Sequence, residues 1–313
     1  MILAASRQEC GALFGEGSVR LSAPLKRSFW LERRTEKRVA YSQPMRSAPL
    51  SRDRKRGTIC DPSAMARHHF RMPRLYVEQP LERDALITLD RQQAHYLVNV
   101  RRLATGATLL AFNGHDGEWR AELAVEGRKW FALTVREQTR PQSPAGDLDY
   151  LFAPLKHARL DYLVQKAVEM GATRLMAVLS RHTQPQRVNL ERMRANAIEA
   201  AEQCGILAIP TIVAPVALDR VIAEWPSQRL LVFCDEGAVT SDPLAVLTAG
   251  RGAKPASLAV LIGPEGGFAD EERAAILRLP NVVRLSLGPR ILRADTAAVA
   301  ALALVQATLG DWS

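Results

Sequence analysis

The amino-acid sequence predicts an α/β protein with a mostly parallel sheet, preceded by a small β-barrel. From Tyr150 onward, apolar strand-like runs alternate with helix-like segments, which is typical of a parallel sheet covered by helices. Between Met72 and Arg140, several short strands are separated by glycine-containing turns, as in small barrels. Two glycine-rich segments near the C-terminus each follow a predicted strand. They indicate a ligand crevice at the strand ends.

Length and composition are those of an ordinary globular protein, with 313 residues, 47% of them apolar and 24% charged. The length allows roughly two domains. No apolar run approaches the ~20 residues that a membrane span needs. Cys10, Cys60, Cys204 and Cys234 are scattered, without CxxC or zinc-ligand spacing. We therefore expect a cytoplasmic protein with reduced thiols and no metal.

The formal net charge of +9 lies entirely in residues 1–71. This stretch holds 15 Lys and Arg against 6 Asp and Glu, whereas the rest of the chain holds 27 of each. It shows no sustained periodicity. It is either a disordered basic arm, with or without a contact to RNA, or the product of a start codon assigned too early. We favour the second interpretation, with the start at Met65 or Met72.

Residues 72–140 are predicted to form the barrel. Asp90 is a suitable N-cap for a helix that runs to about Arg102. A segment with two prolines and a glycine follows, and we interpret 141–149 as a linker. The predicted strands cover 74–77, 85–89, 108–112, 118–125 and 130–136.

Residues 150–313 are predicted to form the parallel α/β domain. Apolar runs of strand length alternate with segments of helical periodicity, and no internal repeat is present. The strands are expected at 150–153, 175–179, 230–233, 258–262 and 283–287, and the helices at 158–170, 190–202, 217–225, 270–279 and 296–309. The last helix, rich in Ala, Leu and Val, is either core or a dimer face, and partial burial at a dimer is favoured.

The first glycine-rich segment, Gly263-Pro-Glu-Gly-Gly267, does not have the spacing of a dinucleotide fingerprint or a P-loop. This disfavours a Rossmann dehydrogenase. The next helix opens with Asp270, Glu271 and Glu272, which stabilise the positive end of the helix and would repel a phosphate. The segment is either a tight turn before a capped helix or a backbone cradle. A cradle would suit a neutral or cationic ligand.

The second segment, 285–296, reads LSLGPRILRADT and leads into an apolar helix. Asp295 is expected to be the N-cap of this helix. Arg290 and Arg293 either line a site or are solvated charges, and the sequence pattern leaves both interpretations open.

The pair LIGPEGGF (261–268) and LSLGPRILRADTA (285–297) resembles the ribosomal small-subunit uridine-N3 methyltransferases, the RsmE family of the SPOUT superfamily. Further similar blocks lie at 95–102, 165–171 and 199–205, together with Lys156 and Asp161. The resemblance covers about 72–313 and no part of 1–71. It departs at Ile206-Leu-Ala-Ile209, where relatives usually continue with arginine, and at Asp295, where many have Glu.

The resemblance implies a SPOUT domain with a trefoil-knotted parallel sheet, a PUA-like β-barrel that contacts RNA, and a homodimer. It implies S-adenosylmethionine as cofactor and N3 of a uridine in 16S rRNA of the small ribosomal subunit as the methylated atom. Two alternatives stay open. One is a SPOUT methyltransferase that acts on a ribose 2′-hydroxyl, and the other is a non-catalytic RNA-binding assembly factor.

The resemblance also assigns site residues. Arg293 would favour the uridine anion, Asp295 and Thr296 would hold Arg293 or the base, and Glu265 is the rival general base. Of the histidines, His95 and His182 are expected to be structural or to face RNA. The cofactor residues would be Cys234, Glu236, Ile262, Gly263, Pro264, Glu265, Gly266, Leu285, Leu287, Gly288, Ile291, Leu292 and Thr296. The candidate RNA contacts are Arg101, Arg102, Lys156, Lys166 and Arg181, and each of these is either an RNA contact or a solvated surface charge.

Overall fold

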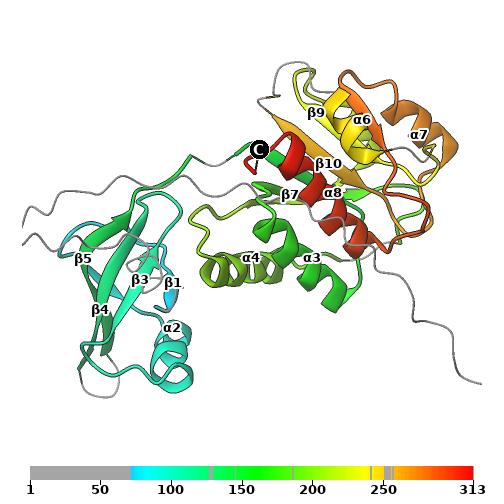
Figure 1. The fold of residues 1–313 in the computed structure, drawn as a ribbon. Coiled ribbons are helices and arrows are strands. Elements are labelled where there is room, and N and C mark those ends of the chain that lie inside the picture. The colour runs from blue at the N-terminus through cyan, green and yellow to red at the C-terminus, as the bar shows by residue number, and fades with distance from the viewer. Residues whose placement is uncertain are drawn as a thin grey trace, which may run out of the picture. The chain divides into compact units, whose positions relative to one another are not determined.

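The computed structural model describes residues 72–126, 130–144, 146–184, 187–239, 242–249, 255 and 257–312. These residues form two sheets, one before residue 141 and one after residue 147 (Figure 1). The expectations for residues 1–71 lie outside the described part of the chain. None of the described helices is long and apolar enough to cross a membrane.

The N-terminal sheet has five strands in the order β1-β3-β4-β5-β2. β1 pairs in parallel with β3, and the other neighbours are antiparallel. Side chains such as Leu97, Leu109 and Leu133 are fully buried in its hydrophobic core. The strands are β1 (Arg74–Tyr76), β2 (Leu86–Thr88), β3 (Thr108–Phe112), β4 (Glu118–Glu126) and β5 (Trp130–Arg140). All five were predicted, although β5 runs four residues further than expected.

The predicted N-cap at Asp90 is confirmed. The Gln93 N–H donates to the Asp90 carboxylate at 2.7 Å, and the Asp90 N–H donates back to the Gln93 side chain at 3.1 Å. This capping box satisfies two backbone donors at the start of α2 (Arg91–His95). The helix continues as a π-helical segment, η1 (Tyr96–Val100).

The C-terminal sheet has six parallel strands in the order β11-β9-β10-β6-β7-β8. Its strands are β6 (Leu148–Phe152), β7 (Arg174–Leu179), β8 (Thr211–Ala217), β9 (Leu230–Cys234), β10 (Leu258–Ile262) and β11 (Val282–Leu285). Its helices are α3 (His157–Glu169), α4 (Leu190–Cys204), α5 (Leu218–Ala223), α6 (Pro243–Ala249), α7 (Asp270–Ile276) and α8 (Ala294–Thr308).

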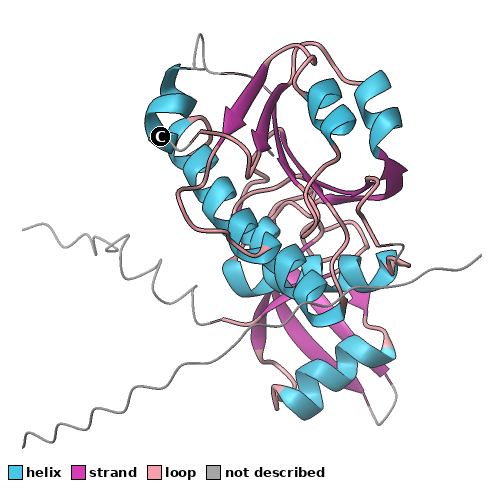
Figure 2. Cartoon of the chain, turned by 90° about the vertical axis from the view of Figure 1, so that its right-hand side faces the viewer, coloured by secondary structure: helices cyan, strands magenta, loops and turns pink. Residues whose placement is uncertain are grey.

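Helices cover both faces of this sheet because its strands are apolar on both sides (Figure 2). In β6, Tyr150 and Phe152 belong to the core shared with α3, α4, α6 and α8, whereas Leu151 belongs to the core shared with α5 and α7. Leu302 and Val305 of α8 are fully buried in the first of these cores. Much of α8 is therefore core of its own chain.

Two elements were not predicted, and one cap was wrong. β8 was missed because Pro215 interrupts its apolar run, and proline is unusual inside a strand. α6 is as short as the predicted α7, but it lacks the acidic first turn that marks the start of α7. Asp295 is not the N-cap of α8. The helix begins two residues earlier than predicted, at Ala294 with Arg293 as N-cap, so Asp295 lies in the first turn and binds Arg159.

Contacts at the end of α4 join it to the N-terminal sheet. The Tyr76 N–H donates to the Glu202 carboxylate at 2.8 Å, and Arg140 donates to the Gly205 carbonyl at 2.9 Å. Glu118, only 1% exposed, accepts from both Arg74 and Arg140. The block at 199–205 therefore anchors the first sheet to the second domain. The apolar residues after it, including Ile206 and Ile209, pack against the core.

Glu202 makes folding stability depend on pH. Its burial, aided by the nearby Glu199 charge, raises its pKa from 4.5 to about 7, although the Tyr76 N–H acts in the opposite direction. The unfolded chain loses this proton near pH 4.5 and the folded chain near pH 7, so the destabilisation that comes from ionised Glu202 is absent below pH 4.5 and grows across that window. The total loss is about 3 kcal/mol at about 1.4 kcal/mol per pKa unit.

We expect Glu202→Gln to remove this dependence, since the amide keeps the acceptor for Tyr76 but does not titrate. The free energy of urea unfolding, measured from pH 5 to 8, should fall for the wild type and stay flatter for the variant. Glu191→Gln, at an exposed position of the same helix, serves as the control and should follow the wild type. A constant difference between Glu202→Gln and wild type at every pH would contradict the assignment.

Candidate active site

Four neighbouring strands end level with one another, and this places their following segments side by side. Ile262 at the end of β10 is in register with Phe152 of β6 and Cys234 of β9, and Cys234 is in register with Leu285 of β11. Because all four strands are parallel, the segments after them leave from the same edge of the sheet. Both glycine-rich segments lie at this edge, as predicted.

The segment 263–268, which we call loop 1, is tightly packed at two of its glycines. A Cβ on Gly263 would lie 2.5 Å from the Phe268 ring, and one on Gly267 would lie 2.3 Å from a carboxylate oxygen of Glu236. Gly267 also has a φ of 67°, which side chains disfavour. His182 reaches the Gly266 and Gly267 carbonyls at 3.1 and 3.2 Å. His182 therefore supports loop 1 from the turn after β7.

The segment 286–293, which we call loop 2, leaves open space beside its glycine. Gly288 has a φ of 101°, and a Cβ built on it would meet nothing within 4 Å. The flanking Leu287 and Leu292 pack partly against the core, whereas Ile291 is 97% exposed. Loop 2 therefore presents bare backbone at Gly288 to open space and the exposed apolar side chain of Ile291 to its surroundings.

The segment after β9 brings an acidic pair to the same edge. Asp235 is buried and accepts from Arg284 at 2.6 Å, whereas the exposed Glu236 accepts from Arg273 at 2.9 Å and lies against Gly267. Burial raises the pKa of the preceding Cys234 thiol to about 12, so this thiol is neutral and apolar in character. Cys234 and Glu236 thus lie where the sequence placed them, next to loop 1.

Arg159, which was not among the predicted site residues, binds two of the predicted catalytic carboxylates. Arg159 Nη1 donates to Glu265 at 2.5 Å, and its Nε donates to Asp295 at 3.1 Å. Arg159 holds the pKa of Asp295 below its usual range. The sequence signal that could have identified Arg159 is its position in the first turn of the helix that follows a central strand. Its partners are 106 and 136 residues away.

Arg293 stands apart from these carboxylates. It is exposed, and within the described residues its guanidinium makes no ion pair or hydrogen bond, so Asp295 is not its partner. Thr296 is also exposed, and its N–H donates to Asp295 at 3.0 Å. Arg293 is therefore free to meet an incoming group, whereas Asp295 is already engaged.

The five predicted RNA contacts are spread over several elements. Lys166 binds Glu169 at 2.7 Å, and Arg181 binds Glu271 at 2.9 Å, so both charges are partly compensated. The exposed Lys156 precedes α3, and Arg101 and Arg102 follow η1 in the N-terminal domain. A shared RNA surface that includes all five stays a prediction.

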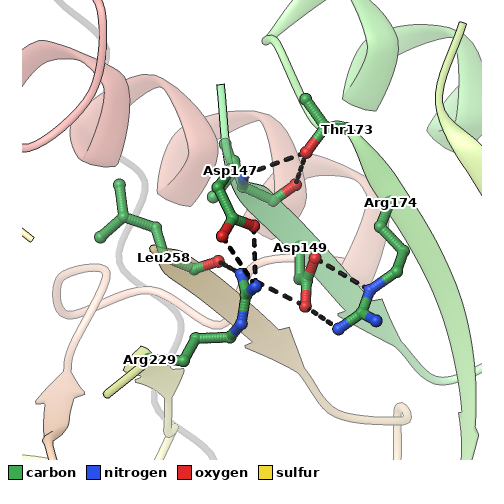
Figure 3. Close-up of polar contacts among 7 residues, drawn as sticks. Asp147, Asp149, Thr173, Arg174, Arg229 and Leu258 are labelled. Carbon is green, nitrogen blue, oxygen red and sulfur yellow. Dashed lines mark hydrogen bonds and ion pairs between the residues drawn. The ribbon is translucent and has the colours of Figure 1, made fainter. Parts of the chain in front are cut away.

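The opposite edge of the sheet is closed by ion pairs (Figure 3). Asp149, with a side chain that is 3% exposed, binds Arg174 and, at 3.3 Å, Arg229. Arg229 also donates to Asp147 and to the Leu258 carbonyl, both near the starts of their strands. These charges therefore satisfy one another at the amino ends of the strands.

The residues at the carboxyl edge fit a cofactor with a sulfonium group. The backbone at Gly288 faces open space, and the carboxylates of Glu236, Glu265 and Asp295 lie at this edge, each paired with an arginine. The Tyr150 hydroxyl is buried near Cys234 and Asp295 and has no partner among the described residues. The described residues contain no cluster of His, Cys, Asp and Glu that could hold a metal ion.

Comparison with known families gives two matches that together cover most of the described chain. Residues 141–306 match a model of an RNA methyltransferase domain, and residues 89–135 match a model of the RNA methyltransferase PUA domain. The first match covers more than half of the chain, and it includes loops 1 and 2.

Individual relatives agree with these models. The ribosomal RNA small subunit methyltransferase E of Synechocystis is 30% identical over 72% of this chain and 74% of its own length, and that of Rickettsia conorii is 28% identical over 74% and 94%. A Legionella pneumophila protein solved with the bound cofactor SAM has a TM-score of 0.66 and 27% identity, covering 76% of this chain and 98% of its own. The chain belongs to the ribosomal RNA small subunit methyltransferase E family.

Proposed function

We propose that this protein transfers a methyl group from S-adenosylmethionine to N3 of a specific uridine in the 16S rRNA of the small ribosomal subunit. The observation that carries the proposal is the convergence of loop 1, loop 2 and the Cys234–Glu236 segment at four level strand ends. Family membership supplies the substrate class. The solved relative with SAM supports the cofactor.

Loops 1 and 2 and the segment after β9 would hold the cofactor. When bound, it supplies an electrophilic methyl group. The task of the chain is then to align N3 with that group, and such alignment contributes roughly 7–11 kcal/mol. N3 must also lose its proton, and Arg293, an exposed cation without a partner among the described residues, would stabilise the resulting uridine anion. Thr296 lies next to Asp295 and would bind the cofactor or the base.

The proposal also includes the RNA partner, a homodimer and the cellular location. The N-terminal sheet, residues 72–140, would contact the RNA, and the target base must be unstacked to reach the site. A homodimer would cover Ile291, which is 97% exposed beside the site. We include in the same proposal a trefoil knot, a cytoplasmic location, and a division into domains at 72–140 and 150–313 with a linker at 141–149.

Nucleoside mass spectrometry tests the proposed function. Purified protein is incubated with S-adenosylmethionine and small subunits that lack the modification, and the 16S rRNA is then digested to nucleosides. The expected product is 3-methyluridine. A 2′-O-methylated nucleoside would instead establish ribose methylation. A protein that neither binds the cofactor nor forms a methylated nucleoside would favour a non-catalytic RNA-binding factor.

A further inference from the structure

Arg159 connects three segments that follow three different strands. It lies in the first turn of α3, after β6, and binds Glu265 of loop 1 after β10 and Asp295 in the first turn of α8 after β11. Three of its nitrogens take part, since Nη2 also donates to Asp295 at 3.4 Å. The Arg159 side chain is 31% exposed and that of Asp295 18%, so this contact is partly shielded from water.

The geometry requires arginine. A guanidinium offers several N–H donors in a planar fork, so one side chain can serve two carboxylates in fixed directions. A lysine carries the same charge on a single nitrogen and loses this fork. Loss of the charge would have a second effect. The Arg159 guanidinium holds the pKa of Asp295 below its usual range, so without it Asp295 would ionise less readily.

We propose that Arg159 is a positioning residue for methyl transfer, which ties loop 1 to the start of α8 and so assembles the cofactor site before the cofactor binds. Three hydrogen bonds to two carboxylates, one in loop 1 and one in the first turn of α8, carry this inference. It deepens the proposed function and rests on it. Arg159 also engages the Glu265 carboxylate, which accepts a charge-assisted hydrogen bond from Nη1.

The test compares Arg159→Gln and Arg159→Lys with the wild type. Arg220→Gln is the matched control, since Arg220 is an exposed arginine that pairs with Glu224 in α5, away from the site loops. In the protein without cofactor, carboxyl groups are titrated by ¹³C NMR. The pKa of Asp295 should rise in Arg159→Gln and stay low in Arg159→Lys and the control.

The dissociation constant of S-adenosylmethionine is then measured by calorimetry on the same proteins. Preorganisation lowers the binding cost, so Arg159→Gln should weaken affinity by about tenfold or more. Arg159→Lys should recover only part of that loss, because it restores the charge without the fork. In methylation assays, Arg159→Gln should raise the KM for S-adenosylmethionine and leave that for the RNA substrate unchanged.

Arg159→Gln that keeps both the wild-type cofactor affinity and the wild-type titration of Asp295 would overturn the inference. Equal losses in Arg159→Gln and Arg159→Lys, with no change in the Asp295 titration, would also overturn it, since they indicate a packing role alone. Wild-type protein that binds S-adenosylmethionine but makes no 3-methyluridine would overturn the proposed function only. The NMR titration and the calorimetry do not involve RNA, so they test the role of Arg159 independently of the methylated product.

Discussion

Arg293→Ala should lower kcat by about 100- to 1,000-fold, the range measured when one charge-stabilising donor is removed from an active site. The reason is its placement: Arg293 begins α8 at the carboxyl edge, is exposed, and has no partner among the described residues. A free cation beside the methyl site would favour the uridine anion. Without it, N3 holds its proton more tightly, so the kcat of Arg293→Ala should also recover as pH rises.

Methylation assays across a pH series measure both the loss of turnover and its recovery as the pH rises. Calorimetry measures cofactor binding separately. The dissociation constant of S-adenosylmethionine should change little, because the cofactor loops keep their backbone. Arg278→Ala, which removes an exposed arginine near the end of α7, should behave as wild type. If Arg293→Ala retained the wild-type turnover, Arg293 would lose the catalytic role.

The sequence predicted the parts of this fold that depend on local pattern. Apolar runs identified β6, β9 and β10, glycine spacing identified loops 1 and 2, and Asp90 identified the start of α2. These signals act within a few residues of chain, as periodicity and capping do. In β8 the apolar run is interrupted by Pro215, and the strand pairs with β7 at the edge of the sheet.

Local sequence patterns could not predict which charged side chains pair with one another. The sequence suggested Arg293 as the neighbour of Asp295 because the two are nearly adjacent in the chain, but the fold brings Arg159 to Asp295 from 136 residues away. The register of four strands decides that contact. Likewise, the net charge of zero in residues 72–313 gave no hint that Glu118 would be buried between two arginines.

Glu118→Ala should lower the free energy of unfolding by about 3–5 kcal/mol, the usual cost of leaving a buried charge without its partner. Arg74 has a side chain that is only 9% exposed, and its Nε donates to Glu118 at 3.0 Å. Arg140 donates to both Glu118 and the Gly205 carbonyl, so the cluster also holds the N-terminal sheet on the end of α4. Removal of Glu118 therefore leaves Arg74 buried and unpaired and loosens this junction.

Urea unfolding at pH 7 measures the loss, with Glu122→Ala as the matched control on the same strand. Glu122 binds Arg136 through side chains that are 41% and 46% exposed, and such surface pairs contribute about 0–1 kcal/mol. Under conditions where Glu118→Ala is folded, it should bind S-adenosylmethionine as the wild type does, because the cofactor loops lie in the other domain. Its KM for small subunits should rise, since the proposed RNA-binding sheet is less firmly held. Equal stability losses for Glu118→Ala and Glu122→Ala would show that burial of the Glu118 cluster adds nothing.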